Sequence, residues 1–298
     1  MLEQRNAISV VDAIAKVMTF GKQGLKELIA LPDAYGRYLA EDIFADQHVP
    51  PFDRSLYDGF ALRAEDTYER NHARFEVIGE IGAGSVFLGK VGALQAVRIM
   101  TGAQIPKGCN AVIMLEQTES CKEGDKTYIE IEKSMDVGEN IFFQGTDTKK
   151  GTLLLKKGTY INPGVVALLA TFGYSPIYVS QKPVVGVLAT GSELLELDEA
   201  LVPGKIRNSN SYMLLAQIER AGGEAVYLGK LEDDLDKGIY AVKEALNRVD
   251  ILLTTGGVSV GDYDYLPDIY KHLGATVLFN KIAMRPGSVT TVAYMGQK

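Results

Sequence analysis

The clearest chemical pattern is a glycine-rich run at residues 255–262, which reads Thr-Gly-Gly-Val-Ser-Val-Gly-Asp. An apolar run precedes it and a segment of helical character follows it, so the sequence predicts a buried strand, a turn and a helix. Glycines let the backbone turn its N–H groups toward an anionic oxygen, and the helix adds positive charge there. Asp262 and Asp264 would repel a bare phosphate unless a divalent cation lay between them. The run indicates either a phosphate-bearing ligand with Mg²⁺ or a tight turn that binds nothing.

Three further loops combine charged, hydroxyl and glycine residues. Residues 51–63 read Pro-Phe-Asp-Arg-Ser-Leu-Tyr-Asp-Gly-Phe-Ala-Leu-Arg, residues 98–103 read Arg-Ile-Met-Thr-Gly-Ala, and residues 144–147 read Gln-Gly-Thr-Asp. We expect the first of them to be an exposed loop and the second to end a strand. Each pattern alone is more typical of a solvated loop than of a binding site.

The carboxy-terminal part, which must position the glycine-rich run, alternates strands with helices. Strands are predicted at 184–188, 225–228, 251–255 and 276–278, and helices at 211–221, 235–249 and 266–273. Strict alternation predicts mostly parallel strands with helices on both faces, hence a three-layer α/β/α domain. Ligands in such folds bind beyond the carboxyl ends of the strands. Those ends are residues 190–193, 232–234 and 255–257, which should share one rim.

The amino-terminal half predicts a different architecture. Ser9 and Asp12 resemble a capping box before a helix, residues 28–39 look like a loop and a helix broken at Pro32, and Pro163 suits the first turn of a helix at 163–171. Between them, short strands predict a small β domain, with examples at 75–81, 96–100, 111–115 and 128–131. The predicted fold class is thus α/β and multidomain. We divide it into an N-terminal linking and dimerisation domain (1–50 with 148–180), a β domain (51–147) and the α/β domain (181–298).

Composition and charge narrow the class of protein. The chain has 298 residues and a net charge of -7 with no basic run, which argues against nucleic acid as a partner. Cys109 and Cys121 are too few for a cysteine zinc site, and reduced thiols are favoured over a disulfide. No apolar run reaches transmembrane length and no signal-peptide pattern begins the chain. We expect a soluble cytoplasmic protein that does not bind a membrane.

The order of the motifs resembles the molybdopterin molybdenumtransferase family. The family pattern P-x-F-D-x-S-x-x-D-G-Y/F-A matches residues 51–61, R-I-x-T-G-A-x-x-P matches 98–106, and the turn G-E-D matches the turn ending in Asp147, with Thr146 in place of Glu. In the α/β part, S-T-G-D/S-E-L matches 189–194, D-S-N matches 208–210, and T-S/T-G-G-V-S-V-G-D-Y-D matches 254–264. Because the matches run in fixed order along nearly the whole chain, the resemblance is specific.

The resemblance implies a role in molybdenum cofactor biosynthesis. Its substrates would be adenylylated molybdopterin and molybdate, with Mg²⁺ as cofactor, and the reaction would release AMP and leave molybdenum on the dithiolene. It also implies a homodimer in which the α/β domain of one subunit faces the β domain of the other. A transient contact with the molybdopterin adenylyltransferase is a further implied partner.

Site residues follow from the same resemblance. The catalytic positions are Asp58, Thr101, Glu193, Asp234 and Asp262, although Asp233 matches as well as Asp234. The substrate-binding positions are Asp147, Gly191, Ser192, Ser209, Gly256, Gly257, Ser259, Arg285 and Ser288. Glu193 and Asp262 are hard oxygen ligands that suit Mg²⁺, and the guanidinium of Arg285 suits the molybdate dianion. Our hypothesis is that a molybdate oxygen attacks the adenylyl phosphate while Mg²⁺ stabilises the departing charge.

Two departures from the family pattern leave an alternative open. The family's Met-Lys-Pro-Gly-Lys-Pro reads Met-Arg-Pro-Gly-Ser-Val at 284–289, so Arg285 keeps one charge and Ser288 removes another. Family members continue beyond this point, so we expect an incomplete α/β domain, no carboxy-terminal β domain, and an unpaired edge strand at 290–294. The alternative function is a non-catalytic molybdopterin-binding or scaffolding module. A nicotinamide-dependent oxidoreductase is disfavoured because the glycine spacing at 256–261 is not GxGxxG.

Overall fold

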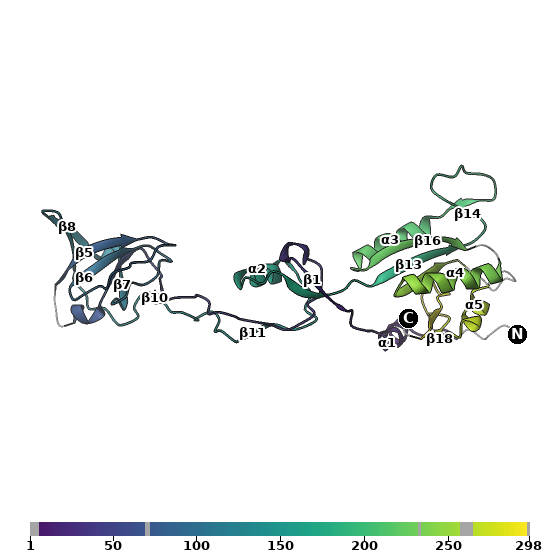
Figure 1. Cartoon of the computed structure of the whole chain (residues 1–298), viewed down its shortest axis with the longest axis horizontal. Coiled ribbons are helices and arrows are strands. Elements are labelled where there is room, and N and C mark those ends of the chain that lie inside the picture. The colour runs from purple at the N-terminus through teal and green to yellow at the C-terminus, as the bar shows by residue number, and fades with distance from the viewer. Residues whose placement is uncertain (1–5, 69–71, 232–233, 257–264, 297–298) are drawn as a thin grey trace. The chain divides into compact units, whose positions relative to one another are not determined.

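A computed structural model describes residues 6–68, 72–231, 234–256 and 265–296 of the chain (Figure 1). The chain divides into two compact units. The unit that we call the α/β unit comprises Met1–Glu41, Gly158–Leu169 and Tyr174–Lys298, and the unit that we call the β unit comprises Asp42–Lys157 and Ala170–Gly173. The division into three domains stays a prediction.

The α/β unit contains a parallel sheet. β13 (Val184–Thr190) lies between β16 (Glu224–Leu231) and β17 (Ile251–Thr255), and these are the strands of this sheet within the described residues. Val187 lies opposite Tyr227 on one neighbour and Leu253 on the other. Five consecutive residues of β13 are buried, which is typical of a strand covered on both faces.

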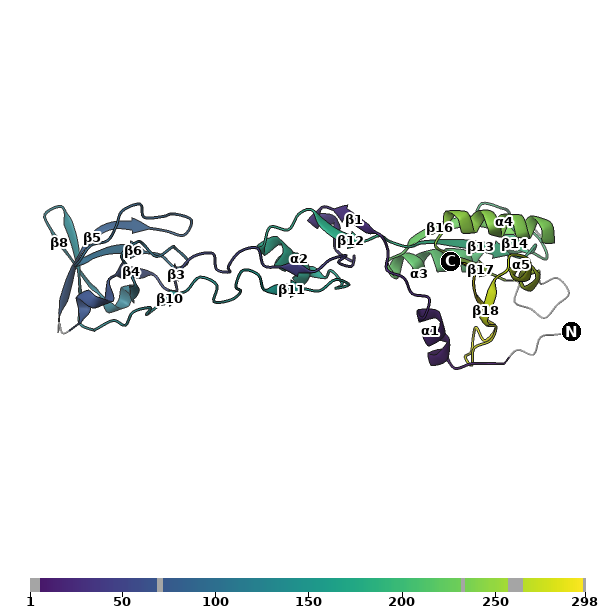
Figure 2. The ribbon, with the colours of Figure 1, turned by 60° about the horizontal axis from the view of Figure 1, so that its bottom comes forward.

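Helices cover the two faces of this sheet. α3 (Ser209–Arg220) packs Ile218 against Val185 and Val187. α4 (Leu235–Arg248) and α5 (Leu266–His272) pack with Leu188, which points to the opposite face because side chains alternate along a strand. Figure 2 shows α4 and α3 on opposite sides of β13. The predicted three-layer α/β/α arrangement is confirmed.

The last described segment differs from the prediction. β18 (Thr276–Phe279) pairs antiparallel with β19 (Val292–Tyr294) and, within the described residues, does not join the parallel sheet. The expectation of an unpaired strand at 290–294 is therefore wrong. The hairpin instead packs Phe279 and Ile282 against Ala13 of α1 (Val10–Met18). Alternating hydrophobicity identifies a strand but carries no information on its direction, so the antiparallel return was missed.

The structure of residues 28–39 also differs from the prediction. β1 (Lys26–Ile29) pairs antiparallel with β12 (Ile177–Ser180), and a 3₁₀ turn at Leu31–Asp33 follows, where a loop and a helix were predicted. Pro32 lies in the first turn of that short element, where its missing N–H costs nothing. The helices predicted from Ser9 and Pro163 are confirmed as α1 and α2 (Pro163–Thr171).

The β unit is organised around a mixed sheet in the order β7-β4-β6-β5-β9-β8. Its strands are β4 (Gly59–Leu62), β5 (Ala73–Ile81), β6 (Gln95–Ile99), β7 (Ala111–Met114), β8 (Glu119–Glu123) and β9 (Lys126–Ile131). Shorter pieces are β2 (Ile43–Phe44), β3 (Arg54–Ser55), β10 (Ile141–Phe142) and β11 (Leu153–Leu155), with 3₁₀ turns at Ala64–Thr67 and Leu115–Gln117.

β4 corrects the expectation that residues 51–63 are an exposed loop. Phe60 and Leu62 lie in one buried cluster and Ala61 in another, so both faces of the strand are covered. β4 pairs antiparallel with β6 and with β7. Four apolar or small residues flanked by charges are too short to signal a central strand, and the pairing on both sides supplies the burial. Only the part before β4 is a loop.

Two smaller findings bear on the class of protein. Cys109 and Cys121 are free thiols. No helix in the part of the chain that the structure describes is long and apolar enough to cross a membrane.

Candidate functional site

The carboxyl ends of the parallel strands bring several predicted site residues together. Ala189 lies opposite Thr255, and Thr190 lies opposite Leu231 of the other neighbouring strand. The Thr190 hydroxyl donates to the Thr255 carbonyl oxygen at 2.8 Å, which ties two strand ends together. Residues 190–193 and Gly256 therefore share one rim, as predicted. Gly257, Ser259 and Asp262 lie outside the described residues.

Gly256 occupies a position that only glycine fits. Its φ is +84°, in the left-handed region, and an added Cβ would lie 2.4 Å from the Thr190 carbonyl oxygen and 2.5 Å from its hydroxyl. A backbone oxygen at that distance cannot give way without disturbing β13. The glycine therefore permits the end of β17 to lie close beside the end of β13.

Glu193 is a rim carboxylate without a partner among the described residues. It is exposed, and its carboxylate folds back over Gly191, where an added Cβ would lie 2.5 Å from Glu193 Oε2. No described residue donates a hydrogen bond to this carboxylate or pairs with it. Next to it, the Ser192 carbonyl oxygen accepts from Lys205 Nζ at 2.5 Å, which anchors the loop. An exposed carboxylate without partners fits Mg²⁺, which keeps several waters and binds through one or two carboxylates.

Asp234 has a structural task. It is the N-cap residue of α4, and its Oδ1 accepts from the Lys237 backbone N–H at 3.0 Å. Such a cap satisfies one of the free N–H groups of the first turn. Asp233, the competing match, lies outside the described residues.

The first turn of α3 begins at the same end of the sheet. Asn208 is buried and caps the helix, its side-chain oxygen accepting from the Ser211 N–H at 3.2 Å. Its amide nitrogen donates to the Tyr227 hydroxyl at 3.0 Å, and that hydroxyl donates to Glu196 Oε1 at 2.8 Å. Ser209 is the first residue of the helix and is exposed, so it lies where a helix N-terminus favours an anion.

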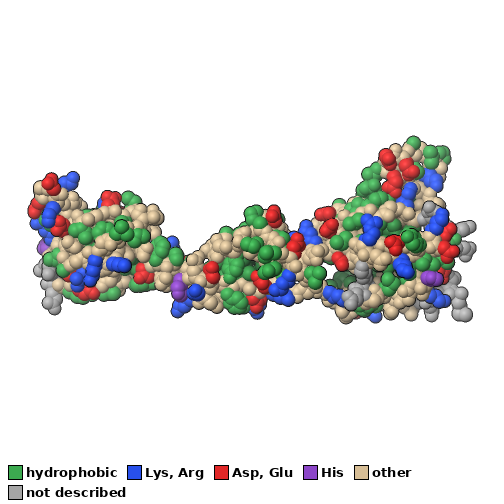
Figure 3. All heavy atoms as spheres, in the orientation of Figure 1, with side chains coloured by type: hydrophobic (Ala, Val, Ile, Leu, Met, Phe, Trp, Pro, Cys, Tyr) green, Lys and Arg blue, Asp and Glu red, His purple; other side chains and the backbone are tan. Residues whose placement is uncertain are grey.

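The loop between β14 (Leu194–Leu195) and β15 (Ile206–Arg207) is held by cations. Arg207 donates to the carbonyl oxygens of Leu197 and Glu199, each at 2.9 Å. Lys230 donates to the Leu194 carbonyl oxygen at 2.9 Å and lies 3.6 Å from Glu199 Oε2. Figure 3 shows acidic and hydrophobic side chains together on this loop, at the upper right. The side chains of Arg207 and Lys230 thus bind groups of this loop.

Arg285 and Ser288 lie in the loop between β18 and β19. Arg285 is exposed, and no described residue pairs with its guanidinium. The Ser288 carbonyl oxygen accepts from the Ile282 N–H at 2.9 Å, and Ala283 N donates to the Ile8 carbonyl oxygen at 2.7 Å. Within the described residues, no hydrogen bond or ion pair links this loop to residues 190–193 or Gly256. Their part in an anion pocket stays a prediction.

In the β unit, the structure brings Asp58 and Thr101 together although 43 residues separate them. Asp58 Oδ1 accepts from the Thr101 N–H at 2.7 Å and from its hydroxyl at 2.8 Å. The backbone hydrogen bond from Thr101, then the hydroxyl, lowers the pKa of Asp58 below its usual 3.8. Both residues are exposed. The pair is an ionised, ordered carboxylate at the end of β6.

The loop of Asp147 is tied to the segment before β4. Asp53 Oδ1 accepts from the Gln144 N–H at 2.7 Å, and Asp147 N donates to the Val49 carbonyl oxygen at 3.0 Å. The Asp147 carboxylate is exposed and unpaired among the described residues. The three loops singled out in this half of the sequence thus meet, because Ser55 N also donates to the Ala103 carbonyl oxygen at 3.0 Å.

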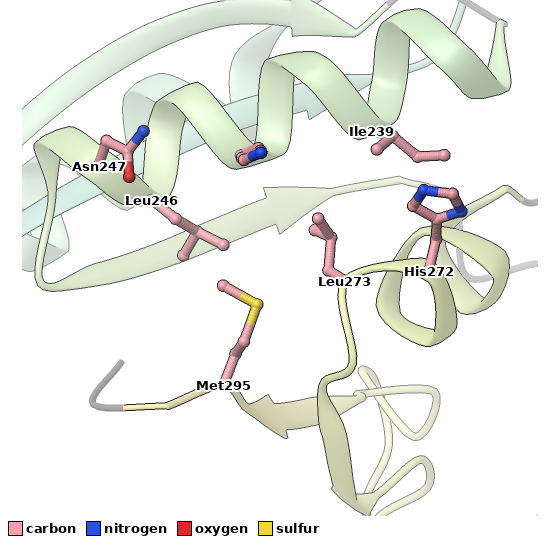
Figure 4. Close-up of a pocket in the computed structure, with 7 residues that line it drawn as sticks. Ile239, Leu246, Asn247, His272, Leu273 and Met295 are labelled. Carbon is pink, nitrogen blue, oxygen red and sulfur yellow. The ribbon is translucent and has the colours of Figure 1, made fainter.

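A cavity of about 500 Å³ lies elsewhere in the α/β unit. It lies between α4, α5 and Met295 and is lined by side chains such as Ile239, Leu246 and His272 (Figure 4). It contains none of the predicted site residues. The strand-end rim, rather than this cavity, is the candidate site of the α/β unit.

Comparison with known proteins decides the family. Residues 6–173 match the model of the MoeA N-terminal region (domain I and II), and residues 186–298 match that of a probable molybdopterin binding domain. The molybdopterin molybdenumtransferase of Bacillus subtilis (strain 168) is 58% identical over 99% of this chain and 69% of its own length. That of Staphylococcus aureus (strain COL) is 50% identical over 100% of this chain and 71% of its own. The chain belongs to the molybdopterin molybdenumtransferase family.

Solved structures agree with this membership. Two crystal structures of a molybdopterin biosynthesis MoeA protein from Pyrococcus horikoshii align with TM-scores of 0.86 and 0.80, at 32% and 36% identity. Each alignment covers 98% of this chain and 73% of the other. The molybdenumtransferase family serves molybdenum cofactor biosynthesis, and its fold is the multidomain α/β fold described above.

The sequence did not predict the hydrogen-bonded group around Tyr227, which is the main feature of the site that it missed. Asn208 was noticed as part of a motif, but Tyr227 and Glu196 were not. Tyr227 lies 19 residues from Asn208 and 31 residues from Glu196 in the sequence. No local pattern marks a tyrosine within a strand as a hydrogen-bond centre. Only the parallel pairing of β16 with β13 places it there.

Proposed function

We propose that this chain inserts molybdenum from molybdate into adenylylated molybdopterin and releases AMP, in a reaction that depends on Mg²⁺. Family membership supports the reaction class. The single structural observation that carries the proposal is the strand-end rim. There the Glu193 carboxylate, which has no partner among the described residues, folds over Gly191, and Gly256 lies against the preceding Thr190. An acidic group next to a backbone able to bind phosphate suits a ligand that combines phosphate with a divalent cation.

The residues have separate tasks in this proposal. Glu193 and Asp262 hold Mg²⁺, which when bound offsets the negative charge of the phosphoanhydride. The first turn of α3 with Ser209, and the turns at Gly191 with Ser192 and at Gly256 with Gly257 and Ser259, receive phosphate and pterin. Arg285 and Ser288 receive molybdate. A molybdate oxygen bonds to the adenylyl phosphorus as the anhydride bond to molybdopterin phosphate breaks. The two dithiolene sulfurs then bond to molybdenum, the bond between molybdenum and the bridging oxygen breaks, and AMP leaves with that oxygen.

The test is AMP release from adenylylated molybdopterin by the 298-residue chain, with Mg²⁺ and with or without molybdate. We expect molybdate-dependent release. Glu193→Gln should reduce the apparent Mg²⁺ affinity at least about tenfold, because loss of even an outer-shell group costs 10- to 100-fold. Asp198→Asn is the matched control, since Asp198 is another exposed carboxylate of the same segment with no partner among the described residues. Wild-type activity of Glu193→Gln at limiting Mg²⁺ would contradict the assignment.

Binding without turnover distinguishes the alternative function. Tight binding of molybdopterin with no AMP release would favour a molybdopterin-binding or scaffolding module. Binding and AMP release measured on the same sample therefore separate the two candidate functions.

We also propose that the chain works as a cytoplasmic homodimer and contacts the molybdopterin adenylyltransferase transiently. Light scattering should give twice the subunit mass of 32.4 kDa. A subunit-sized particle at assay concentrations would contradict the dimer. Transfer of adenylylated molybdopterin between the two enzymes faster than through free solution would support the contact.

A further inference from the structure

Tyr227 lies where strand, loop and helix meet. It belongs to β16, it accepts a hydrogen bond from Asn208 at the start of α3, and it donates one to Glu196 in the loop after β14. Asn208 is 1% exposed, so few other partners reach it. One hydroxyl group therefore joins three elements that sequence alone does not connect.

The directions of these hydrogen bonds are fixed. A carboxylate only accepts, so the Tyr227 proton points to Glu196 and leaves the hydroxyl oxygen to accept from Asn208 Nδ2. That choice orients the Asn208 amide and leaves its oxygen for the Ser211 N–H. Burial, followed by the hydrogen bond to Glu196, raises the pKa of Tyr227 to about 12, so the hydroxyl keeps its proton at neutral pH.

The same group reaches the segment of Glu193. Glu196 lies three residues beyond it, and its backbone N–H donates to Glu199 Oε2 at 2.6 Å. Glu193 is itself tied back, because its carbonyl oxygen accepts from the Ile206 N–H at 2.9 Å. The hydroxyl of Tyr227 thus lies between the start of α3 and the loop after β14. Only the two residues of β14 separate that loop from Glu193, whose carboxylate has no partner among the described residues.

We propose that Tyr227 is a positioning residue for ligand binding at the strand-end rim. Its hydroxyl orders the Asn208 cap and, through Glu196, the segment that follows Glu193 before molybdopterin binds, so that the ligand does not have to order them. This inference rests on the proposed function of the rim and deepens it. Tyr227 acts through Asn208 and Glu196 and does not itself touch the reacting atoms.

The experiment compares Tyr227→Phe with Tyr212→Phe in the full 298-residue chain. Tyr212 is a matched control because its ring lies 5.7 Å from that of Tyr227, while its hydroxyl has no hydrogen bond among the described residues. The first measurement is amide hydrogen exchange at Ser211, which should be faster in Tyr227→Phe and unchanged in Tyr212→Phe. The second is the Kd for metal-free molybdopterin, which should rise about tenfold in Tyr227→Phe, as expected for one lost hydrogen bond.

The outcomes separate this inference from the proposed function. Unchanged Ser211 exchange in Tyr227→Phe would overturn the positioning role whether or not ligand binds. A wild-type chain that binds molybdopterin, with an equal Kd for Tyr227→Phe, would overturn the inference and leave the proposed function standing. No binding by the wild type would overturn the proposed function and, with it, the ligand part of the inference. A purely structural role would lower the unfolding temperature without changing Kd or the ratio of kcat to KM.

Discussion

Replacing Gly256 by alanine should be unusually damaging for so small a change. An L-residue pays about 1–2 kcal/mol to adopt the left-handed conformation at φ +84°. In addition, the new Cβ would lie 2.4 Å from the Thr190 carbonyl oxygen, well inside the ordinary contact distance of 3.4 Å or more. Overpacking of this kind costs about 1–3 kcal/mol. The sum predicts a loss of about 2–5 kcal/mol in the free energy of unfolding.

The matched control is Gly222→Ala in the same unit. Gly222 has nearly the same backbone conformation, φ +87°, but an added Cβ would meet nothing within 4 Å. Its substitution should cost only the conformational part, about 1–2 kcal/mol. Urea unfolding followed by circular dichroism measures both variants, since the chain has no tryptophan to report by fluorescence. The difference between the variants, about 1–3 kcal/mol, isolates the contact with Thr190.

The result that would refute this reasoning is equal stability of the two variants. It would mean that Gly256 moves away from Thr190 without cost, and that the Thr190–Thr255 hydrogen bond does not fix the rim. A larger loss in Gly256→Ala, accompanied by weaker molybdopterin binding, would connect the close approach of the strand ends to the ligand site.

Three other predictions concern single groups. Hydrogen bonds from Thr101 lower the pKa of Asp58, so the stabilisation by the ionised carboxylate is present above the unfolded pKa and is lost as the pH falls through the lower folded value. The difference in free energy of unfolding between wild type and Asp58→Asn should therefore vanish as the pH falls below about 3.8. A difference that stays constant down to low pH would contradict this prediction. Asp234→Ala should lower the free energy of unfolding by about 1 kcal/mol through loss of the α4 cap, whereas Asp236→Ala, in the same turn, should cost less. Burial raises the pKa of Cys109 to about 12, so a thiol reagent at mildly alkaline pH should modify Cys121 first, and mass spectrometry of peptides would show the order.

Local signals predicted most of the helices. The Ser9 side chain accepts from the Asp12 N–H, as the capping pattern implied, and α2 begins at Pro163. α3 and α4 begin within two residues of their predicted starts at 211 and 235, because apolar residues at helical spacing mark them. These features depend on residues close in sequence, which is why sequence alone finds them.

Pairing between distant strands was less predictable. β4 is short and is bracketed by charged residues, yet it is a buried central strand because β6 and β7 bind its two edges. β18 reads like the strands before it, yet it pairs with β19 in the opposite direction. In both cases the missing information was the identity of the partner, which no window of local sequence contains.

The adjacency of the candidate site residues was partly predictable. The rule that ligands bind at the carboxyl ends of parallel strands placed residues 190–193 beside Gly256, and the register of β13 with β17 does the same. No such rule places Asp58 beside Thr101. Their proximity was implied only by the family resemblance, and the structure supplies the physical reason, which is a carboxylate accepting two hydrogen bonds from one threonine.

Hydrogen bonding divides the candidate acidic residues into two groups with different expected chemistry. Asp58 and Asp234 already accept hydrogen bonds from backbone N–H groups, so their carboxylates hold loop and helix geometry. Glu193 and Asp147 are exposed, and no described residue pairs with their carboxylates. A direct Mg²⁺ ligand must present unshared oxygen lone pairs, so Glu193 is a stronger metal candidate than Asp234 although the resemblance gave both catalytic positions. Mg²⁺ titration of Glu193→Gln beside Asp234→Asn tests this division, since equal losses of Mg²⁺ affinity in the two variants would show that hydrogen-bond occupancy does not select the ligand.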